Sequence, residues 1–369
     1  MIKLSTPDLG EEELQEIKKV LDSGWLIQGD KVEEFENSVK EYLKVKHAIA
    51  VSSGTAALHL SLMALNIKKG DEVIVPDFTF PATANVVEIV GANCTFIDIS
   101  LESFNIDVSK IEEKITKKTK AIIVVHEFGY PAEMDKIIEL AKKYNLKVIE
   151  DAACALGSEY KGKKVGTIGD IGCFSLHPRK NITTGEGGIV VTNNDNYAEL
   201  IKMLRNHGMK KTNGKINFEI PGLNYRLTNI QGAIGIVQMK KLEDIIEKRK
   251  KIAELYTKEL SKINWIKVPN EPDYGKHIWQ TYHIILGNNI NRNSLISYLM
   301  ENGIETNYGA YAVHNEPYYK TKYHLKNCDF KNSIIASNKG LALPIHSKLT
   351  EEEVSIIIDK LNSFVEVIK

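Results

Sequence analysis

The sequence has few cysteines, and they show no pattern that would serve disulfides or a structural metal. Its 369 residues include four: Cys94, Cys154, Cys173 and Cys328. Disulfide-stabilised domains carry cysteines at a much higher density, and none of these four lies in a Cys-x-x-Cys or Cys/His spacing typical of zinc sites. We therefore expect free thiols in a reducing cytoplasm, and no metal site.

The chain also lacks net charge and long apolar runs. It has 48 Lys and Arg against 48 Asp and Glu, a formal charge of +0. Such a balance supplies no overall field to attract nucleic acid or anionic lipid. No stretch approaches the roughly 18 apolar residues that a membrane-spanning helix needs, and the N-terminus leads directly into an acidic helix. We expect a soluble protein whose partners include neither nucleic acid nor a membrane.

Apolar residues are nevertheless plentiful, at 43% of the chain, and many occur in short β-branched runs. Six such runs predict strands, at residues 48–51, 73–75, 95–99, 121–125, 148–150 and 188–192. Segments with helical spacing, notably 55–65 and 134–144, separate several of them. Continuous apolar strands that alternate with helices are typical of an α/β fold with a mostly parallel sheet covered on both faces.

The length of the chain favours two domains, because it exceeds the usual size of a single core. A long helical stretch at about 228–260 leads out of the region of apolar strands. After it come a strand and two helices, at residues 281–286, 293–302 and 350–364. We predict a large α/β domain over residues 1–245 and a small α+β domain over residues 246–369.

Polar and aromatic residues follow the predicted strands, where ligands of parallel sheets bind. Residues 52–57, Ser-Ser-Gly-Thr-Ala-Ala, open a helix after the first strand. Their N–H groups and hydroxyls could bind a phosphate, or could simply cap the helix. Residues 75–80 end the next strand with Phe78 and Phe80, either of which could stack on a flat ring or belong to the core.

An acid and a lysine complete this set. Asp151 ends an apolar strand, where it needs a cation opposite unless it caps the next segment. Lys180 lies in a segment followed by glycines whose backbone can approach a bulky ligand closely. Pyridoxal phosphate requires a lysine to hold its aldehyde as a Schiff base and an acid to keep its pyridine nitrogen protonated. The order of phosphate site, aromatic residue, acid and lysine favours this cofactor over a solvated lysine.

These motifs continue along nearly the whole chain. Further ones are Gly-Trp at 24–25, Gly-Leu-Asn-Tyr-Arg-Leu-Thr-Asn-Ile-Gln at 222–231 and Leu-Ala-Leu-Pro at 341–344. In them the chain resembles the sugar aminotransferases of the DegT/DnrJ/EryC1/StrS group, which are fold-type I, aspartate-aminotransferase-like enzymes. The resemblance implies a large domain with a mostly parallel sheet between helices, followed by a smaller C-terminal α+β domain.

The resemblance also implies which residues bind pyridoxal 5'-phosphate. Lys180 and Asp151 are catalytic by this resemblance: the lysine attaches the cofactor and shuttles a proton, and the acid pairs with the pyridine nitrogen. The expected cofactor contacts are Gly54, Thr55, Phe80, Asp151, Cys154, Ser175, Lys180 and, from a second subunit, Asn224. The last contact implies a homodimer with shared active sites. Cys154 stands where many relatives carry Gln, Glu or His, and a thiol is a weaker hydrogen-bond partner for the phenolic oxygen.

Three residues are candidates for binding the substrates. By position, Tyr311 and His314 approach a nucleotide-linked sugar, although a structural role for the histidine is the alternative. Arg226 is the candidate for an anion, either the carboxylate of the amino donor or the diphosphate. For its role as a base, Lys180 is expected to have a pKa lowered by burial beside a cationic ring.

The implied reaction moves the amino group of L-glutamate to a keto group of a nucleotide-diphospho-keto-deoxysugar, for polysaccharide or glycan biosynthesis. Residues 183–188, Thr-Thr-Gly-Glu-Gly-Gly, resemble relatives that act at C4 of a 4-keto-6-deoxy sugar more than those that act at C3. Amination at C3, a lyase and a non-catalytic regulatory protein on the same fold remain open. Relatives that dehydrate sugars carry histidine in place of Lys180, so the lysine argues for transamination.

Overall fold

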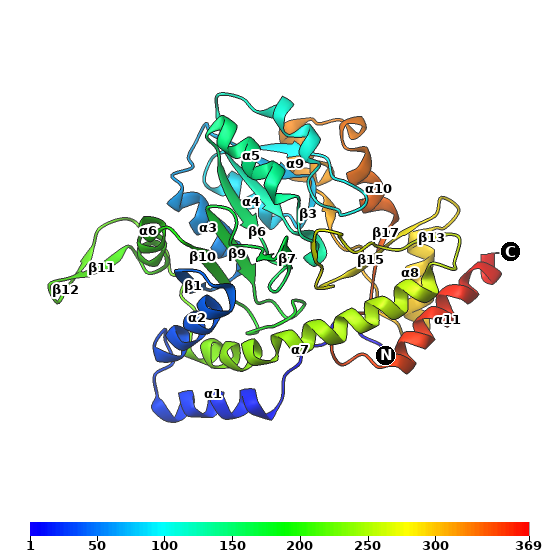
Figure 1. The fold of residues 1–369 in the computed structure, drawn as a ribbon, viewed down its shortest axis with the longest axis horizontal. Coiled ribbons are helices and arrows are strands. Elements are labelled where there is room, and N and C mark those ends of the chain that lie inside the picture. Colours follow the sequence, from blue (N-terminus) through cyan, green and yellow to red (C-terminus); the bar gives the residue numbers. More distant parts are fainter. Residues whose placement is uncertain (369) are drawn as a thin grey trace.

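A seven-stranded sheet forms the centre of the computed structural model, which describes residues 1–368 (Figure 1). Its strands are β1 (His47–Val51), β2 (Glu72–Pro76), β4 (Asn93–Ile97), β5 (Thr119–Val125), β6 (Lys147–Asp151), β9 (Ile171–Ser175) and β10 (Gly188–Thr192). They lie in the order β1-β10-β9-β6-β5-β2-β4. Only β10 runs antiparallel to its neighbours, so the predicted mostly parallel sheet is confirmed.

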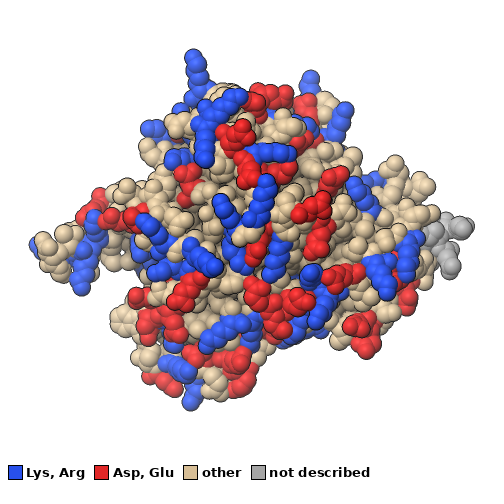
Figure 2. All heavy atoms as spheres, viewed as in Figure 1, with Lys and Arg blue, Asp and Glu red and all other residues tan. Residues whose placement is uncertain are grey.

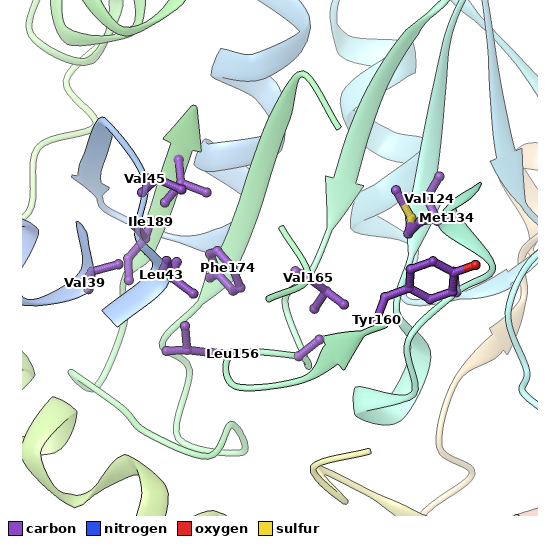
Figure 3. Close-up of a cluster of buried hydrophobic side chains, with 14 of the residues drawn as sticks. Val39, Leu43, Val45, Val124, Met134, Leu156, Tyr160, Val165, Phe174 and Ile189 are labelled. Carbon is purple, nitrogen blue, oxygen red and sulfur yellow. The ribbon is translucent and has the colours of Figure 1, made fainter. Parts of the chain in front are cut away.

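Helices cover both faces of this sheet because successive strand residues point to opposite sides. In β5, Ile122 and Val124 join one buried cluster, and Ala121 and Ile123 join another. The first cluster, part of which Figure 3 shows around Phe174, includes residues of α2 (Asp30–Leu43), α5 (Met134–Tyr144) and α7 (Asn229–Leu260). The second includes residues of α3 (Gly54–Ala64), α4 (Ala82–Ile89) and α6 (Asp195–Arg205).

Capping residues set where these helices begin and end. Thr228 precedes α7, and its hydroxyl oxygen accepts a hydrogen bond from Gln231 N at 3.3 Å while the glutamine side chain reaches back to Thr228 N at 3.0 Å. This reciprocal pair satisfies two amides that have no partner inside the helix. Asn145 ends α5 in the left-handed conformation, with φ 53°, which an asparagine tolerates better than most residues.

The remaining elements form smaller units. The strands are β3 (Phe78–Thr79), β7 (Glu159–Tyr160), β8 (Lys163–Lys164), β11 (Met209–Thr212), β12 (Lys215–Phe218), β13 (Ile266–Lys267), β14 (Gly275–Lys276), β15 (Tyr282–Leu286), β16 (Tyr311–Ala312) and β17 (Gly340–Leu343). The helices are α1 (Glu11–Ser23), α8 (Arg292–Glu301), α9 (Pro317–Tyr323), α10 (Lys331–Lys339) and α11 (Glu351–Ile368). Short 3₁₀ turns are η1 (Val108–Lys110), η2 (Glu112–Lys114), η3 (Glu127–Gly129), η4 (Val313–Asn315) and η5 (Asn327–Asp329). The β11–β12 hairpin projects from the body of the molecule (Figure 1).

A third buried cluster surrounds the sheet β13-β15-β17 and includes residues of α8 and α11. Helix α7 contributes to two clusters: its side chains up to Ile246 pack in the first, and those from Ile252 onward pack in the third. The second cluster also takes in Val313 and Tyr319, so part of the C-terminal region packs against the helices of the large sheet. The division of the chain at residue 245 stays a prediction.

The surface shows no dominant charge. Basic and acidic side chains are interspersed over the face drawn in Figure 2. Within residues 1–368, no helix combines the length and the apolar character that crossing a membrane requires.

Candidate active site

A cavity of about 520 Å³ lies beyond the carboxyl ends of the sheet strands. It falls within the range of roughly 300 to 1,000 Å³ that is usual for small-molecule sites. Its lining includes Lys180, Asp151, Phe80 and the first residues of α3. The C-terminal region contributes the opposite wall, with Gln280, Thr281, Asn307, Gly309, Ala342, Leu343 and Ile345. The cavity therefore lies where the two predicted domains meet.

Lys180 reaches this cavity from a tight turn after β9. The backbone N–H of Lys180 donates to His177 O at 2.8 Å, and the Nζ amine donates to Cys154 Sγ at 2.9 Å. Burial lowers the pKa of Lys180, but Cys154, Asp151 and Glu127 outweigh it and raise that pKa above its ordinary value. Without a cofactor, three acidic groups therefore face the amine and keep it protonated. The lowered pKa expected from the sequence was for a lysine beside a cationic ring, and it stays a prediction.

Asp151 forms the floor of the cavity. Its Oδ2 accepts a hydrogen bond from Thr83 Oγ1 at 2.8 Å, and its Oδ1 accepts one from Ala153 N at 3.2 Å. Burial raises the pKa of this carboxyl, which is 5% exposed. Within the described chain no cationic side chain lies within ion-pair distance of it, so a ligand cation such as a pyridinium would supply the missing partner.

The phosphate site predicted at the start of α3 is brought to the same cavity. Ser53 caps the helix, with its Oγ accepting from Ala56 N at 3.0 Å, while Gly54 and Thr55 line the cavity beside Ser175. The motif therefore caps the helix and lines the cavity at once, because Ser53 also belongs to the lining. The free N–H groups of the first helical turn favour an anion there.

Of the two candidate aromatic residues, only Phe80 lines the cavity. Phe78 is fully buried in a cluster with Phe104 and Phe128, whereas Phe80 is 65% exposed. Tyr311 packs against Phe80 edge to face, with ring centroids 6.4 Å apart, because β16 pairs with β3. A flat ring could therefore stack on Phe80, with Tyr311 beside it.

Three predicted residues lie away from the cavity of their own chain. His314 is buried, with Nδ1 at 2.7 Å from Asp77 Oδ2 and Nε2 at 3.1 Å from Asn327 Oδ1, so the geometry favours the structural alternative for it. Asn224 is exposed and bridges to Asn206 through the backbone, and Arg226 Nη1 donates to the side chain of Asn206. Asn224 and Arg226 thus both contact Asn206, and neither lines the cavity.

Several residues of the cavity were not predicted from the sequence. Thr83 donates a hydrogen bond to Asp151, the exposed residue Arg179 belongs to the lining, and Glu127 brings a second buried carboxyl. Glu127 follows the end of β5, so the rule that placed Asp151 at a strand end would also have found it. Thr83 lies within a helix, where nothing local marks a contact to a residue 68 positions away.

The residues present fit pyridoxal phosphate. A buried carboxyl without a counterion, a lysine amine, an exposed aromatic face and a helix N-terminus surround one cavity. The fit is close at Gly54, where a Cβ atom would lie 2.9 Å from Ser175 Cβ. The N-terminus of α3 therefore packs so closely against the end of β9 that residue 54 has no room for a side chain.

Comparison with known proteins agrees with this chemistry. The sequence pattern of the DegT/DnrJ/EryC1/StrS aminotransferase family matches residues 7–362. The chain belongs to this family. It is 39% identical to a GDP-perosamine synthase of Caulobacter vibrioides over 365 residues, which is 98% of this chain and 97% of that protein.

Two solved structures have nearly the same fold. PseC of Helicobacter pylori, an aminotransferase involved in the biosynthesis of pseudoaminic acid, superposes with a TM-score of 0.94 at 31% identity, covering 99% of each chain. Spr1654 of Streptococcus pneumoniae, a putative sugar aminotransferase in its PMP-form, gives 0.94 at 28% identity over 100% of each chain. This member of the DegT/DnrJ/EryC1/StrS family is thus a sugar aminotransferase that depends on pyridoxal phosphate.

Replacing Gly54 with Ala is expected to weaken cofactor binding about tenfold or more, because crowding of this kind costs about 1–3 kcal/mol. The new Cβ would push the start of α3 away from Ser175. Gly10, which precedes α1, is a matched control, since an added Cβ there meets no described atom within 4 Å. Titration of each purified variant with the cofactor measures the effect. Equal affinities of the two variants would contradict the role of Gly54.

Proposed function

We propose that this enzyme transfers the amino group of L-glutamate to C4 of a nucleotide-linked 4-keto-6-deoxy sugar, for glycan biosynthesis. The observation that carries the proposal is the meeting of Lys180, Asp151 and the α3 N-terminus in one cavity. These groups suit the aldehyde, the ring nitrogen and the phosphate of a single cofactor. A location in the cytoplasm stays a prediction.

The roles of the residues follow from their chemistry. When bound, pyridoxal phosphate supplies an electron sink for the carbon that loses its proton. Lys180 Nζ would hold the aldehyde group of the cofactor, and the same amine is the base that would move a proton to and from the substrate. Asp151 would keep the ring nitrogen protonated, and Phe80 would pack against the ring. The start of α3, with Ser175, holds the phosphate.

Two substrates must enter the same cavity in turn, so we expect ping-pong kinetics. Arg179 lines the mouth and is exposed, whereas burial lowers the pKa of the neighbouring His177 and so favours its neutral form. Arg179 is therefore a better candidate than Arg226 for the carboxylate or diphosphate of a substrate in this chain's own cavity. The leucine and isoleucine side chains of the C-terminal wall help to exclude water.

A homodimer with shared sites belongs to the same proposal. Asn224 and Arg226 do not line the cavity of their own chain, and both contact Asn206, three residues before the start of the β11–β12 hairpin that projects from the body (Figure 1). A second copy could present them to the neighbouring cavity, with Asn224 reaching the cofactor's phosphate. Tyr311, beside Phe80, is the candidate that approaches the sugar.

The choice of C4 rests on the motif at residues 183–188 and on the likeness to a GDP-perosamine synthase. Incubation of the enzyme with L-glutamate and either a 4-keto or a 3-keto nucleotide-linked deoxysugar, followed by mass spectrometry and NMR of the product, tests the proposal. We expect an aminated sugar from the 4-keto compound only.

Product from the 3-keto compound alone would replace C4 by C3 amination. No aminated sugar from either compound, combined with an absorption band that does not change on adding glutamate, would favour a regulatory protein on this fold. The same experiment with L-alanine or L-aspartate in place of L-glutamate identifies the donor.

A further inference from the structure

Glu127 is a buried acid that lines the cavity, and the proposed reaction assigns it no role. It lines the cavity and is 5% exposed. Acids are rarely buried this far unless they are paired. Among the side chains that the structure describes, none donates a hydrogen bond to its carboxyl, and the nearby backbone amide of Phe128 only slightly lowers the pKa of that carboxyl.

A neighbouring acid shows what a structural carboxyl looks like in this fold. Glu150, in β6, accepts hydrogen bonds from the backbone amides of Gly166, Ile168 and Gly169, at 2.6 to 2.7 Å, and lies 2.9 Å from His126 Nε2. Four partners satisfy both of its oxygens. Glu127 has no such set of hydrogen-bond partners. Its position at the cavity is therefore not explained by contacts that stabilise the fold.

The backbone holds Glu127 in this position at a conformational cost. Asn105 clamps the turn from both ends: its Oδ1 accepts from Glu127 N at 2.8 Å, and its Nδ2 donates to Tyr130 O at 3.1 Å. Between them Phe128 has φ 57°, in the left-handed region that a bulky residue rarely adopts. The Phe128 ring stacks on His283 with centroids 4.6 Å apart, and this packing stabilises the strained turn.

The charged groups that influence Glu127 are Lys180 and Asp151, the two proposed catalytic residues. Lys180 lowers the pKa of its carboxyl and Asp151 raises it. The carboxyl in turn raises the pKa of Cys154, whose thiol lies 2.9 Å from the Lys180 amine. Burial, the larger effect, raises the pKa of Glu127 to about 8, and the Asp151 charge adds to the rise while Lys180 opposes it. At neutral pH this carboxyl is therefore mostly protonated, and in alkaline solution it becomes an anion next to Lys180.

We propose that Glu127 is a positioning residue of this enzyme that acts on Lys180 as a pH-dependent charge. In its neutral form it leaves Asp151 as the one buried carboxylate that acts on Lys180, since the remaining acid of the lining, Glu186, is exposed, and the lysine nitrogen can then lose its proton more readily. In its ionised form it adds a second anion, which favours the cationic form of that nitrogen. The inference depends on the proposed attachment of pyridoxal phosphate to Lys180.

The visible absorption of the cofactor-loaded enzyme tests this role, because the band reports the protonation state of the nitrogen that joins the cofactor to the protein. In Glu127→Gln we expect the midpoint of the spectral pH titration to fall by about one unit or more, since a nearby opposite charge shifts a pKa by about 1–3 units. Below about pH 7 the variant and the wild type should have the same spectrum, because the amide resembles the protonated acid. A purely structural role would change the spectrum at every pH.

Two further variants keep the test decisive. Glu127→Asp retains an ionisable group, and its midpoint should lie closer to that of the wild type than to that of the glutamine variant. Glu133→Gln is the matched control: the Glu133 side chain is 42% exposed and pairs with Lys136 outside the cavity, so the midpoint should not move. If Glu127→Gln titrates like the wild type, the inference is wrong, while the proposed function stands. If the wild type itself shows no such band, both the inference and the proposed function are wrong.

Discussion

Replacing Lys180 with Ala is expected to abolish turnover and the visible absorption of the bound cofactor together. In the proposed function, the amine that lies 2.9 Å from Cys154 in the cavity is the group that would bind the aldehyde and move the proton. Loss of a general base alone lowers rates by about 10²–10⁴-fold, and this variant loses the attachment as well. We therefore expect a fall of about 10⁴-fold or more in kcat, measured by the release of 2-oxoglutarate.

A lysine on the surface provides the control for this variant. Lys136 in α5 is 63% exposed and pairs with Glu133, and exposed pairs of this kind contribute little to stability. Lys136→Ala should therefore retain the rate and the spectrum of the wild type. Amination at the normal rate by Lys180→Ala would show that another residue carries the reaction.

The second large effect is expected at Asp151. Replacing it with Asn keeps a side chain of the same shape next to Thr83 but removes the negative charge that would hold the ring nitrogen protonated. The loss of one preorganised electrostatic contact lowers kcat by about 10²–10³-fold. We expect a fall of at least this size with cofactor still bound, as single-turnover kinetics and the cofactor content of the purified variant would reveal.

Asp135 offers a matched change at an exposed position. Its side chain is 62% exposed and pairs with Lys161, so Asp135→Asn should leave kcat unchanged. A rate near that of the wild type in Asp151→Asn would mean that the acid serves only to hold Thr83 and the backbone of Ala153.

Local sequence patterns were sufficient to predict most strands of the large sheet. The β-branched runs predicted β1, β2, β4, β5, β6 and β10, but β9 was missed because its sequence, Ile-Gly-Cys-Phe-Ser, has no β-branched run. The glycine is there for a tertiary reason: a Cβ on Gly172 would lie 2.0 Å from Gly166 O. The antiparallel direction of β10 depends on strand pairing, which no local pattern encodes.

The site was predictable where it follows strand ends. That rule placed Gly54, Phe80 and Asp151 near each other, and the structure brings all three to one cavity with Lys180. Ser175, at the end of the missed strand β9, was expected there only from the family resemblance. It did not predict that His314 would be buried against Asp77, a contact between residues 237 positions apart. Contacts of that kind depend on how the C-terminal region packs against the large sheet.

The most direct test of the account is the site of covalent attachment. The cofactor-loaded enzyme would be reduced with borohydride and digested, and its peptides examined by mass spectrometry. We predict a pyridoxyl group on Lys180 and on no other lysine. A label on a different lysine, or no label in a protein that still aminates a nucleotide-linked sugar, would contradict the central claim.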